Sequence, residues 1–548
     1  MSTKYFSLYY KKAIDFDNND KSDIYSPWNV SKIQNYNPVY SLYFNVDEST
    51  CNKISLNHKY HLKDKNTIVD SSSNPVNCEM YIKCAPLLDP IHYLIGKYKT
   101  ETTKMRELPT INSHEDNVMK KILEVNNSSY VDSFFNYLSS QILHTHTIPH
   151  CIDFYGSHLV IQDKFKYNIC DDIDYLKESE YFLGNNNKMY ELDENANDTN
   201  SVASQNTQTN RRKIIIKDEN IIMDDVTDYF DELEDGTNVN NDMELVFEHE
   251  KEDDDSSDDS SISYSSADED EENDEEDESE DEDEEDDSED EDEEDDEISA
   301  YIYNFPVQMI YLEKCDGTLD QLLEDEMLND TQSASALIQV IFTLIIYQNS
   351  FKFTHNDLHT NNIVYKNTKE KFLYYNYKGK KYKVPTYGRI FKIIDFGRSM
   401  YKYRGKWLCS DSFAPGGDAH GQYNVEPFFN ENKPRIEPNM SFDLCRLGCS
   451  LYDFVFDSDE PLPKLLTPLQ DIVLNWCKDD NGMNILYKKN GEERYPNFKL
   501  YKMIARLVHD KMPDDQLGLP FFSQFSISSD KLKRNKIIDL DKIPKYYA

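Results

Sequence analysis

Two short motifs carry side chains suited to phosphoryl transfer. In HNDLHTNNIV, His355 is followed two residues later by Asp357, and Asn362 lies five residues beyond that. Further along the chain, KIIDFGRS contains Asp395. An aspartate can orient an acceptor hydroxyl, and an asparagine and a second aspartate can supply oxygen ligands to metal ions that bridge phosphates. The spacing therefore favours Asp357 as a catalytic residue and Asn362 and Asp395 as metal ligands.

At these residues the chain resembles the protein-kinase superfamily, whose catalytic loop reads HxDxxxxN and whose metal-binding loop reads DFG. The resemblance implies that His355 and Asp357 form the catalytic centre, and that Phe396 and Gly397 complete the metal-binding loop. It further implies ATP and Mg²⁺ or Mn²⁺ as cofactors. The expected reaction is transfer of the γ-phosphate to serine or threonine of a protein substrate.

Two more segments follow the family order. FDLCRLG places Asp443 and Gly448 at the spacing of the large-lobe helix whose aspartate binds the catalytic-loop backbone in the family. EMYIKCAP places Lys83 on an alternating strand, where the family's lysine contacts the ATP phosphates. Taken singly, these segments also fit an ordinary amphipathic helix and a surface strand. Their order along the chain favours the kinase-like interpretation.

The segment MIYLEKCDGTL aligns with the strand and hinge that hold adenine in the family. The alignment implies Leu312 as gatekeeper, with the Glu313 carbonyl and the Cys315 amide facing the adenine edge. Asp320 could reach the ribose, although an acid in the first turn of a solvated helix is the simpler interpretation.

The chain departs from the family pattern in the small lobe. No glycine precedes Gly96, so the GxGxxG loop that brings backbone amides close to the phosphates is absent. We expect PVYSLYFNVDESTCNKISL to supply the first two strands instead. The helical segment YVDSFFNYLSSQIL contains no glutamate to pair with Lys83, and Asp132 is its candidate substitute.

The catalytic loop itself also departs from common protein kinases. His359 stands where serine/threonine kinases usually carry lysine, and this HxDxH pattern resembles haspin-type and small-molecule kinases. Asn356 replaces the arginine that pairs with a phosphorylated activation loop. We therefore predict activity that does not depend on phosphorylation of that loop; a loss of activity after phosphatase treatment would contradict this. The APE motif is missing, and IEP at Ile436 to Pro438 is its candidate replacement.

Charge is concentrated in one segment of this chain of 548 residues, whose formal charge is −46. Between Lys251 and Glu297, the acidic tract, 33 residues are acidic and one is basic, so −32 of the charge lies there. Such a segment buries too little apolar surface to offset chain entropy. We predict a disordered insertion from 185 to 298 that could bind basic proteins, and no nucleic-acid partner.

We expect no association with membranes, because the longest apolar run, ALIQVIFTLIIY, is too short to span a bilayer and no signal peptide is evident. The ten cysteines fall singly, which favours reduced thiols in a cytoplasmic location. The composition, rich in Asn, Lys, Ile and Tyr, resembles that of giant DNA virus proteins, for which host cytoplasm or virion would be the location. We interpret His144, His146 and His150 as a solvated helix end rather than a metal site.

We predict an α+β protein with a two-lobed protein-kinase-like fold. Its expected parts are an N-terminal extension (1–34), the first part of a small strand-rich lobe (35–184), the insertion (185–298), the last small-lobe strand and hinge (299–325), a helical large lobe (326–530) and a C-terminal tail (531–548).

Two alternative functions stay open. The first is a pseudokinase scaffold that uses the acidic tract for binding, favoured by the missing glycine loop and glutamate. The second is a small-molecule kinase, favoured by HNDLH.

Overall fold

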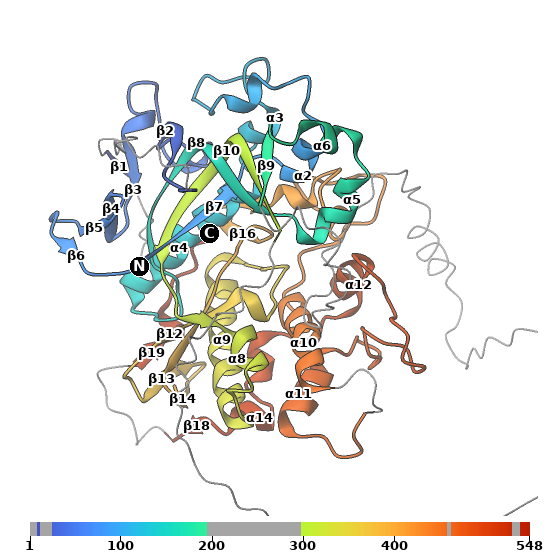
Figure 1. Ribbon diagram of the computed structural model, residues 1–548. Helices are drawn as coiled ribbons and strands as arrows, with labels where there is room; N and C mark the ends of the chain where they lie inside the picture. Colours follow the sequence, from blue (N-terminus) through green and yellow to red (C-terminus); the bar gives the residue numbers. More distant parts are fainter. Residues whose placement is uncertain (1–7, 11–24, 194–297, 457–461, 529–536) are drawn as a thin grey trace, which may run out of the picture. The chain divides into compact units, whose positions relative to one another are not determined.

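A computed structural model of the protein describes residues 8–10, 25–193, 298–456, 462–528 and 537–548 (Figure 1). These residues form a mixed α+β structure with several sheets and a group of helices. The predicted disordered insertion and its acidic tract lie outside the described residues, apart from 185–193 and 298.

The largest sheet has five strands, all paired antiparallel. Along the sheet the order is β2 (Val30–Gln34), β8 (Phe154–Asn168), β10 (Ser299–Glu313) and β7 (Met80–Pro86), and β9 (Tyr190–Leu192) pairs with the start of β10. Strand β10 is buried over most of its length, which explains its nearly continuous apolar sequence. The strand predicted around Lys83 is confirmed as β7.

One long helix packs against this sheet. Helix α4 (Ser128–His146) begins after Asn127, whose side chain accepts a hydrogen bond from the amide of Ser129. Buried residues occur all round this helix, because the sheet covers one side of it and the segment following Asp395 covers another. The helix predicted in this part of the chain is confirmed.

The predicted first two strands are wrong. PVYSLYFNVDESTCNKISL forms the short helix α1 (Tyr40–Tyr43), a 3₁₀ turn and then β3 (Ile54–Leu56), which pairs with β1 (Leu8–Tyr10) rather than with the large sheet. Tyr40 and Tyr43 are both buried, so the aromatic residues that suggested strands serve as packing residues of a helix. Among the described residues, β7 is therefore an edge strand of the large sheet.

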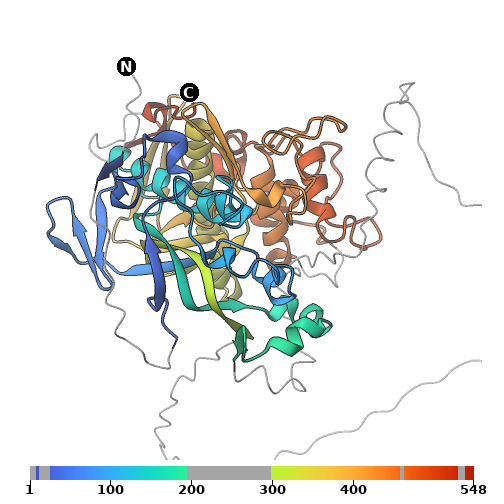
Figure 2. The same ribbon diagram turned by 90° about the horizontal axis from the view of Figure 1, so that it is seen from above.

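A second small sheet lies to one side of the large one (Figures 1 and 2). It consists of β4 (Tyr60–Asp64), β5 (Thr67–Asp70) and β6 (Pro75–Val76). Short helices occupy other connections of this part of the chain: α2 (Pro90–Leu94), α3 (Lys120–Leu123), α5 (Ile173–Lys177) and α6 (Glu180–Asn185).

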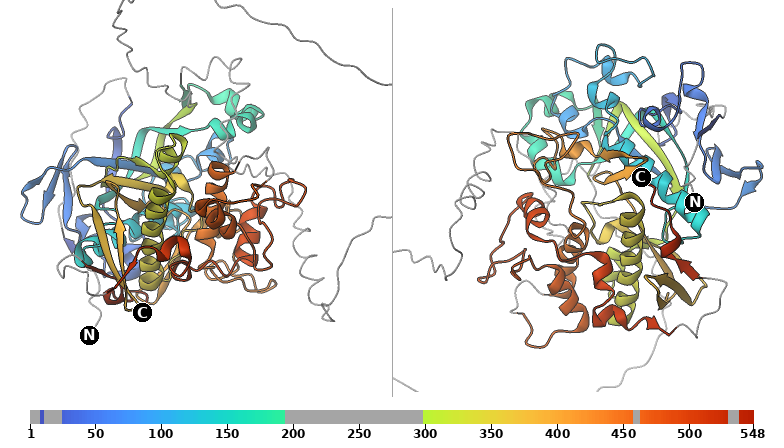
Figure 3. Two further views of the ribbon diagram at one scale, coloured as in Figure 1. Left: turned by 90° about the horizontal axis from the view of Figure 1, so that it is seen from below. Right: turned by 180° about the vertical axis from the view of Figure 1, so that it is seen from behind.

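Helices dominate the second half of the chain, with α9 in their midst (Figures 1 and 3). They are α8 (Leu319–Glu324), α9 (Asp330–Phe351), α10 (Phe442–Val455), α11 (Pro468–Trp476), α12 (Lys499–Leu507), α13 (Pro513–Gln516) and α14 (Pro520–Ser523). Helix α9 starts with a capping box made by Asn329 and Gln332. It is long and apolar enough to cross a membrane, unlike the shorter run considered above, but 94% of its apolar window is buried inside the structure.

Small sheets also occur in the second half of the chain. Strand β12 (Ile363–Asn367) follows Asn362, and its partner β15 (Arg389–Ile393) leads to Asp395. Between them, β13 (Phe372–Tyr377) and β14 (Lys380–Pro385) form an antiparallel hairpin with a lysine-rich turn. The other short strands are β11 (Gly317–Thr318), β16 (Met400–Tyr403), β17 (Lys406–Cys409), β18 (Ser526–Ile527) and β19 (Ile537–Asp539).

Three short strands lie in segments that were predicted to be outside the two lobes. β2 lies in the predicted N-terminal extension, β9 lies in the predicted insertion, and β19 in the predicted C-terminal tail pairs with β13. Each is only three to five residues long. Short edge strands derive their stability from the partner strand, so their own sequences carry little signal.

Candidate active site

Asp443 holds the backbone of the catalytic loop. Its carboxylate accepts hydrogen bonds from the amide of His355, at 2.9 and 3.1 Å, and from the amide of Asn356, at 2.9 Å. Asp443 is fully buried at the start of α10, and burial raises the pKa of its carboxyl group. The structure therefore brings together the two motifs that the sequence placed about ninety residues apart.

Gly448 is one turn further along α10 and allows α11 to approach closely. A β-carbon at this position would lie 2.7 Å from Cβ of Trp476. Trp476 is fully buried, so it has little room to move aside. This contact gives the physical reason for a glycine in the FDLCRLG motif.

Asp357 is held from two sides. Its Oδ1 accepts a hydrogen bond from the Tyr501 hydroxyl at 2.9 Å, and its Oδ2 lies 3.4 Å from Nη1 of Arg398. The hydroxyl of Tyr501 in turn accepts a hydrogen bond from Nε of Arg446 at 2.9 Å. Burial alone would raise the pKa of Asp357, but Arg398, His359 and Arg446 outweigh it and hold this pKa well below its usual range. Asp357 is therefore ionised and already oriented.

Sequence reasoning missed three of these residues: Arg398, Arg446 and Tyr501. Arg398 directly follows Gly397, and Arg446 lies three residues after Asp443, so both stand inside motifs that were recognised. Tyr501 lies in α12, far along the chain, and no motif marks it. Its position next to Asp357 depends on the packing of α12 against α10.

Asn362 lies next to Asp357 at the end of the same loop. Its Nδ2 donates a hydrogen bond to the backbone carbonyl of Asp357 at 2.9 Å and lies 3.0 Å from Nε2 of His359. Burial lowers the pKa of His359 to about 4, so this imidazole is neutral at pH 7 and can accept that hydrogen bond. The side-chain amide is thereby fixed with its nitrogen toward the loop.

Lys83 forms ion pairs with two carboxylates. Its Nζ is 2.8 Å from Oδ2 of Asp132 and 2.8 Å from Oδ1 of Asp395. Burial opposes the charge on this ammonium group, yet the two acids raise its pKa above the ordinary value. Burial raises the pKa of Asp132, whereas for Asp395 the charge of Lys83 outweighs partial desolvation and lowers the pKa. Asp132, the candidate named from the sequence, is therefore an acid that faces Lys83.

Asp132 also fixes the loop around Asp395, the candidate metal-binding loop. Its Oδ1 accepts a hydrogen bond from the backbone amide of Phe396 at 2.9 Å. The ring of Phe396 is fully buried and packs 4.6 Å from the ring of Phe135. Asp395 itself has a φ of 63°, a left-handed conformation that Asp tolerates better than most residues. The hydrogen bond of the Phe396 amide and the packing of the Phe396 ring hold Asp395 in this conformation.

His355 and Asn356 bind backbone and side chains around the loop. Nε2 of His355 is 2.9 Å from the carbonyl of Ile394. Asn356 has a φ of 65°, donates to the carbonyl of Arg398 and accepts a hydrogen bond from the Tyr423 hydroxyl at 2.8 Å. These contacts make His355 and Asn356 positioning residues of the loop, since neither side chain faces Asp357 in them.

The residues predicted to bind adenine and ribose lie at the end of β10 and in α8. Leu312 is buried, and the Glu313 side chain forms an ion pair with Lys392. Cys315 lies two residues after the end of β10, and burial raises the pKa of its thiol to about 12. Asp320 is buried and accepts a hydrogen bond from the Thr360 hydroxyl of the catalytic loop, a contact that sequence reasoning did not foresee.

The oxygen donors of Asn362 and Asp395 suit a hard cation such as Mg²⁺. The Asp395 side chain is 48% exposed, so a ligand can reach it. Outside this pair, the described residues contain no group of three or more His, Cys, Asp or Glu that could hold a metal ion. The part of the candidate site that would bind the phosphates of ATP fits a nucleotide less well. β7 is an edge strand, and the described residues place no glycine turn beside Lys83.

The three histidines considered as a metal site point to different partners. His144 binds Asp153, His146 binds the Tyr546 hydroxyl, and His150 lies between the Phe391 carbonyl and the Tyr375 hydroxyl. The interpretation as a solvated helix end is wrong for His150, which is fully buried.

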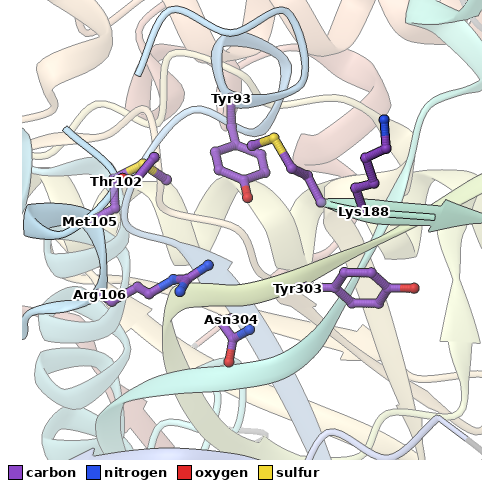
Figure 4. Close-up of a pocket in the computed structure, with 8 residues that line it drawn as sticks. Tyr93, Thr102, Met105, Arg106, Lys188, Tyr303 and Asn304 are labelled. Carbon is purple, nitrogen blue, oxygen red and sulfur yellow. The ribbon is translucent and has the colours of Figure 1, made fainter. Parts of the chain in front are cut away.

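A cavity of about 360 Å³ lies elsewhere, between α2, a 3₁₀ turn and β10. Figure 4 shows Arg106 and Tyr93 reaching toward its centre, whereas the Tyr303 ring points to its edge. None of the predicted site residues lines it. The cavity is therefore separate from the candidate active site.

Comparison with known proteins gives one partial similarity. Over 97 residues the chain is 33% identical to the serine/threonine-protein kinase haspin of Bos taurus. The matching segment covers 18% of this chain and 12% of that protein. No model of a known protein family matches the chain. This similarity supports a kinase-like relation for a segment of the chain.

Proposed function

We propose that the protein is an ATP- and Mg²⁺-dependent kinase that phosphorylates serine or threonine of protein substrates, with a two-lobed kinase-like fold. The single observation that carries this proposal is the convergence of Asp357, Asn362, Asp395 and Lys83, with Asp443 bound to the catalytic-loop backbone. The partial similarity to haspin adds support.

Each residue has a specific role in this proposal. Ionised Asp357 accepts the hydrogen bond of the substrate hydroxyl and orients its oxygen toward the γ-phosphate. Asn362 and Asp395 would hold the metal ion, which neutralises charge on the phosphates when bound. Lys83, which now pairs with both Asp132 and Asp395, contributes its ammonium group to the phosphates. Leu312 and the backbone of Glu313 and Cys315 border the adenine.

Phosphate binding must differ from that of kinases with a glycine-rich loop. Without backbone amides over the phosphates, the affinity for ATP depends more on Lys83 and on the metal ion. We therefore expect weak binding of ATP in the absence of divalent cations. The KM for ATP should depend strongly on the concentration of Mg²⁺ or Mn²⁺.

The direct test is transfer of labelled γ-phosphate from ATP, with Mg²⁺ or Mn²⁺, to the protein itself and to basic and acidic protein substrates. Wild type is compared with Asp357→Ala and Asp395→Asn. The matched control is Asp325→Asn, an exposed aspartate at the end of α8. We expect incorporation on serine or threonine that both site substitutions abolish and the control retains.

One other function is favoured by a specific observation. Within the described part of the chain no glycine turn lies beside Lys83, and this feature, together with the two ion pairs of Lys83, would also suit a pseudokinase scaffold. No incorporation and no thermal shift with Mg-ATP would support the scaffold, whose binding partners could then be sought with and without residues 185–298. Incorporation into small hydroxylated molecules but not proteins would point to a small-molecule kinase.

A further inference from the structure

The cavity between α2, the 3₁₀ turn Lys104–Arg106 and β10 has the size of a small-molecule site (Figure 4). Its volume of about 360 Å³ lies in the range of about 300–1,000 Å³ that is usual for such sites. The residues that line it come from three segments of the chain, 93–106, 188–189 and 303–304. We call it the β10 cavity. None of its residues belongs to the candidate active site, so the proposed phosphoryl transfer assigns it no role.

Positive charge lines the β10 cavity. Arg106 and Lys188 supply the cations, and none of the described residues that line the cavity is acidic. The ammonium group of Lys188 donates a hydrogen bond of 2.9 Å to the carbonyl of Gly184, whereas the guanidinium group of Arg106 reaches toward the centre of the cavity (Figure 4). Arg106 is therefore the cation that a bound molecule would meet.

Acids that neighbour the lining residues in the sequence are paired with other cations. They form these ion pairs: Glu101 with Lys104, Glu107 with Lys32, and Glu191 with Lys164. Within the described part of the chain, the guanidinium group of Arg106 forms no hydrogen bond or ion pair. Its donors are available to an anion, because a planar guanidinium can bind a carboxylate or phosphate through two parallel hydrogen bonds.

Tyr93 presents a buried hydroxyl to the same space. Only 5% of this residue is exposed, and its ring packs against the ring of Phe305 with 5.4 Å between the centroids. The hydroxyl reaches toward the centre of the cavity (Figure 4) and has no hydrogen-bond partner among the described residues. Burial raises the pKa of Tyr93, so the hydroxyl keeps its proton at pH 7 and can donate a hydrogen bond. An anion in the cavity would supply the missing acceptor.

Asn304 lines the cavity from inside a strand, in a backbone conformation that strands disfavour. Tyr303 pairs with Lys164 and Phe305 pairs with Gln162 across β10 and β8, and between them Asn304 has a φ of 52°. Residues other than glycine that are held in this left-handed region occur preferentially at ligand sites. The side-chain amide of Asn304 forms no hydrogen bond with the residues that the structure describes. It is therefore a third polar group that a ligand could engage.

The rest of the lining is apolar and suits a ring. Met105 is 3% exposed, and Met189 contributes a second thioether, whose sulfur lies 3.2 Å from the Tyr181 hydroxyl. The ring of Tyr303 borders the cavity, while its hydroxyl donates a hydrogen bond of 2.7 Å to Glu191. Methionine sulfur makes favourable contacts with aromatic rings, and methionine side chains adapt to the shape of a ligand.

We propose that the β10 cavity binds a small aromatic anion, a carboxylate or a phosphate monoester. Its charged group is held by Arg106, Tyr93 and Asn304, and its ring lies against Met105 and Met189. Charge-assisted hydrogen bonds from a guanidinium are stronger than neutral ones, so Arg106 contributes most to the affinity. The proposal does not depend on the proposed kinase function.

The test measures binding to the full-length protein by isothermal titration calorimetry at low salt, without nucleotide or metal ions. The probes are benzoate, phenyl phosphate, benzamide and inorganic phosphate. We expect the better of the two aromatic anions to bind with a Kd of about 1 mM or below. Benzamide has the shape of benzoate without its charge and should bind at least about tenfold more weakly. Inorganic phosphate should bind more weakly than phenyl phosphate, because it has no ring to contact the methionines.

Three substitutions then assign the bound anion to the cavity. Arg106→Gln removes the cation, and Asn304→Asp places a negative charge in the cavity at nearly unchanged size. Each should weaken binding of the aromatic anions at least about tenfold, and Asn304→Asp should leave benzamide unaffected. Tyr93→Phe keeps the ring packed on Phe305 and should weaken binding about fivefold. The matched control is Lys99→Gln, at an exposed cation that does not line the cavity and should leave binding unchanged.

The preference between benzoate and phenyl phosphate identifies the anionic group that the cavity takes. The proposal is overturned if neither anion binds, if benzamide binds as tightly as benzoate, or if binding survives both Arg106→Gln and Asn304→Asp. The last result would mean that the probe binds elsewhere, such as beside Lys83. Because Arg106 is exposed, Arg106→Gln should keep the wild-type melting temperature, so the test stays valid if Asn304→Asp lowers it. A failure of phosphate transfer would not alter any of these results.

Discussion

At the scale of single residues, Asp357, the candidate catalytic aspartate, is more tightly held than its motif alone implies. Asp357 has Tyr501 on one oxygen and Arg398 near the other. Arg446, behind Tyr501, adds a further positive charge. This setting keeps Asp357 ionised, so in the proposed reaction it would accept a hydrogen bond from the substrate hydroxyl rather than store a proton.

Replacing Tyr501 tests whether its hydrogen bond helps to keep Asp357 ionised. Tyr501→Phe removes a hydrogen bond that lowers the pKa of Asp357 but keeps the ring stacked on Phe498. The pKa of Asp357 should therefore rise, and kcat should fall about tenfold. Initial-rate kinetics at pH 7 measure the change in kcat. Tyr387→Phe, at an exposed tyrosine, is the control, and equal kcat values for Tyr501→Phe and wild type would contradict the assignment.

Asp132 is the residue that decides whether Lys83 is correctly placed. Asp132→Asn keeps the size of the side chain but removes the charge facing Lys83 and weakens the acceptor for the Phe396 amide. We expect the free energy of unfolding to fall by about 1–3 kcal/mol and kcat/KM for ATP to fall about tenfold. Urea unfolding and initial-rate kinetics measure the two effects. A variant with wild-type values in both would show that this ion pair is dispensable.

At the scale of elements, close helix packing supports the catalytic loop. Helix α10 supplies Asp443 and Arg446, and it packs against α11 through Gly448. Helix α12 supplies Tyr501. Side chains from these helices bind the backbone of the loop and Asp357 itself, so the position of Asp357 depends on how the helices pack.

Gly448→Ala should separate α10 from α11. The new methyl group would meet the buried Trp476, and such overpacking costs about 1–3 kcal/mol in the free energy of unfolding. Thermal and urea unfolding measure the loss. Gly184→Ala in α6 is the matched control, because nothing lies within 4 Å of its β-carbon position. That substitution should be neutral or slightly stabilising; equal effects at the two positions would contradict the packing argument.

At the scale of the whole molecule, a buried histidine links the two halves of the chain. His150 follows α4, and its Nδ1 and Nε2 lie 2.9 Å from the Phe391 carbonyl and 2.7 Å from the Tyr375 hydroxyl. The neutral imidazole satisfies both partners by donating to the carbonyl and accepting from the hydroxyl. Burial lowers the pKa of His150 from 6.5 to about 4.

This pKa predicts a loss of stability in acid. Between pH 6.5 and 4 the unfolded chain binds a proton that the folded protein excludes, so the free energy of unfolding decreases as pH falls. For His150 the loss is about 2 kcal/mol at pH 5. Urea unfolding at pH 7 and pH 5 should show a smaller pH effect in His150→Asn than in wild type. His114→Asn, at an exposed histidine, is the control; the same pH effect in His150→Asn and wild type would contradict the prediction.

The sequence by itself determined which loops carry the candidate site residues and that the fold is of the α+β class. HNDLHTNNIV, IDFG and FDLCRLG each contain polar residues at fixed spacing, and local spacing persists in the folded structure. The strand around Lys83 and the helix over YVDSFFNYLSSQIL were also predicted from the pattern of apolar residues in each segment.

Only the tertiary structure decided which distant residues meet at the site. Tyr501 reaches Asp357, and Asp132 reaches both Lys83 and the Phe396 amide, through packing of elements far apart in the chain. The aromatic segment before β3 folded as a helix because burial of Tyr40 and Tyr43 outweighed their preference for strands. Periodicity reports which face of an element is buried, but not which element covers it, and the site depends on the latter.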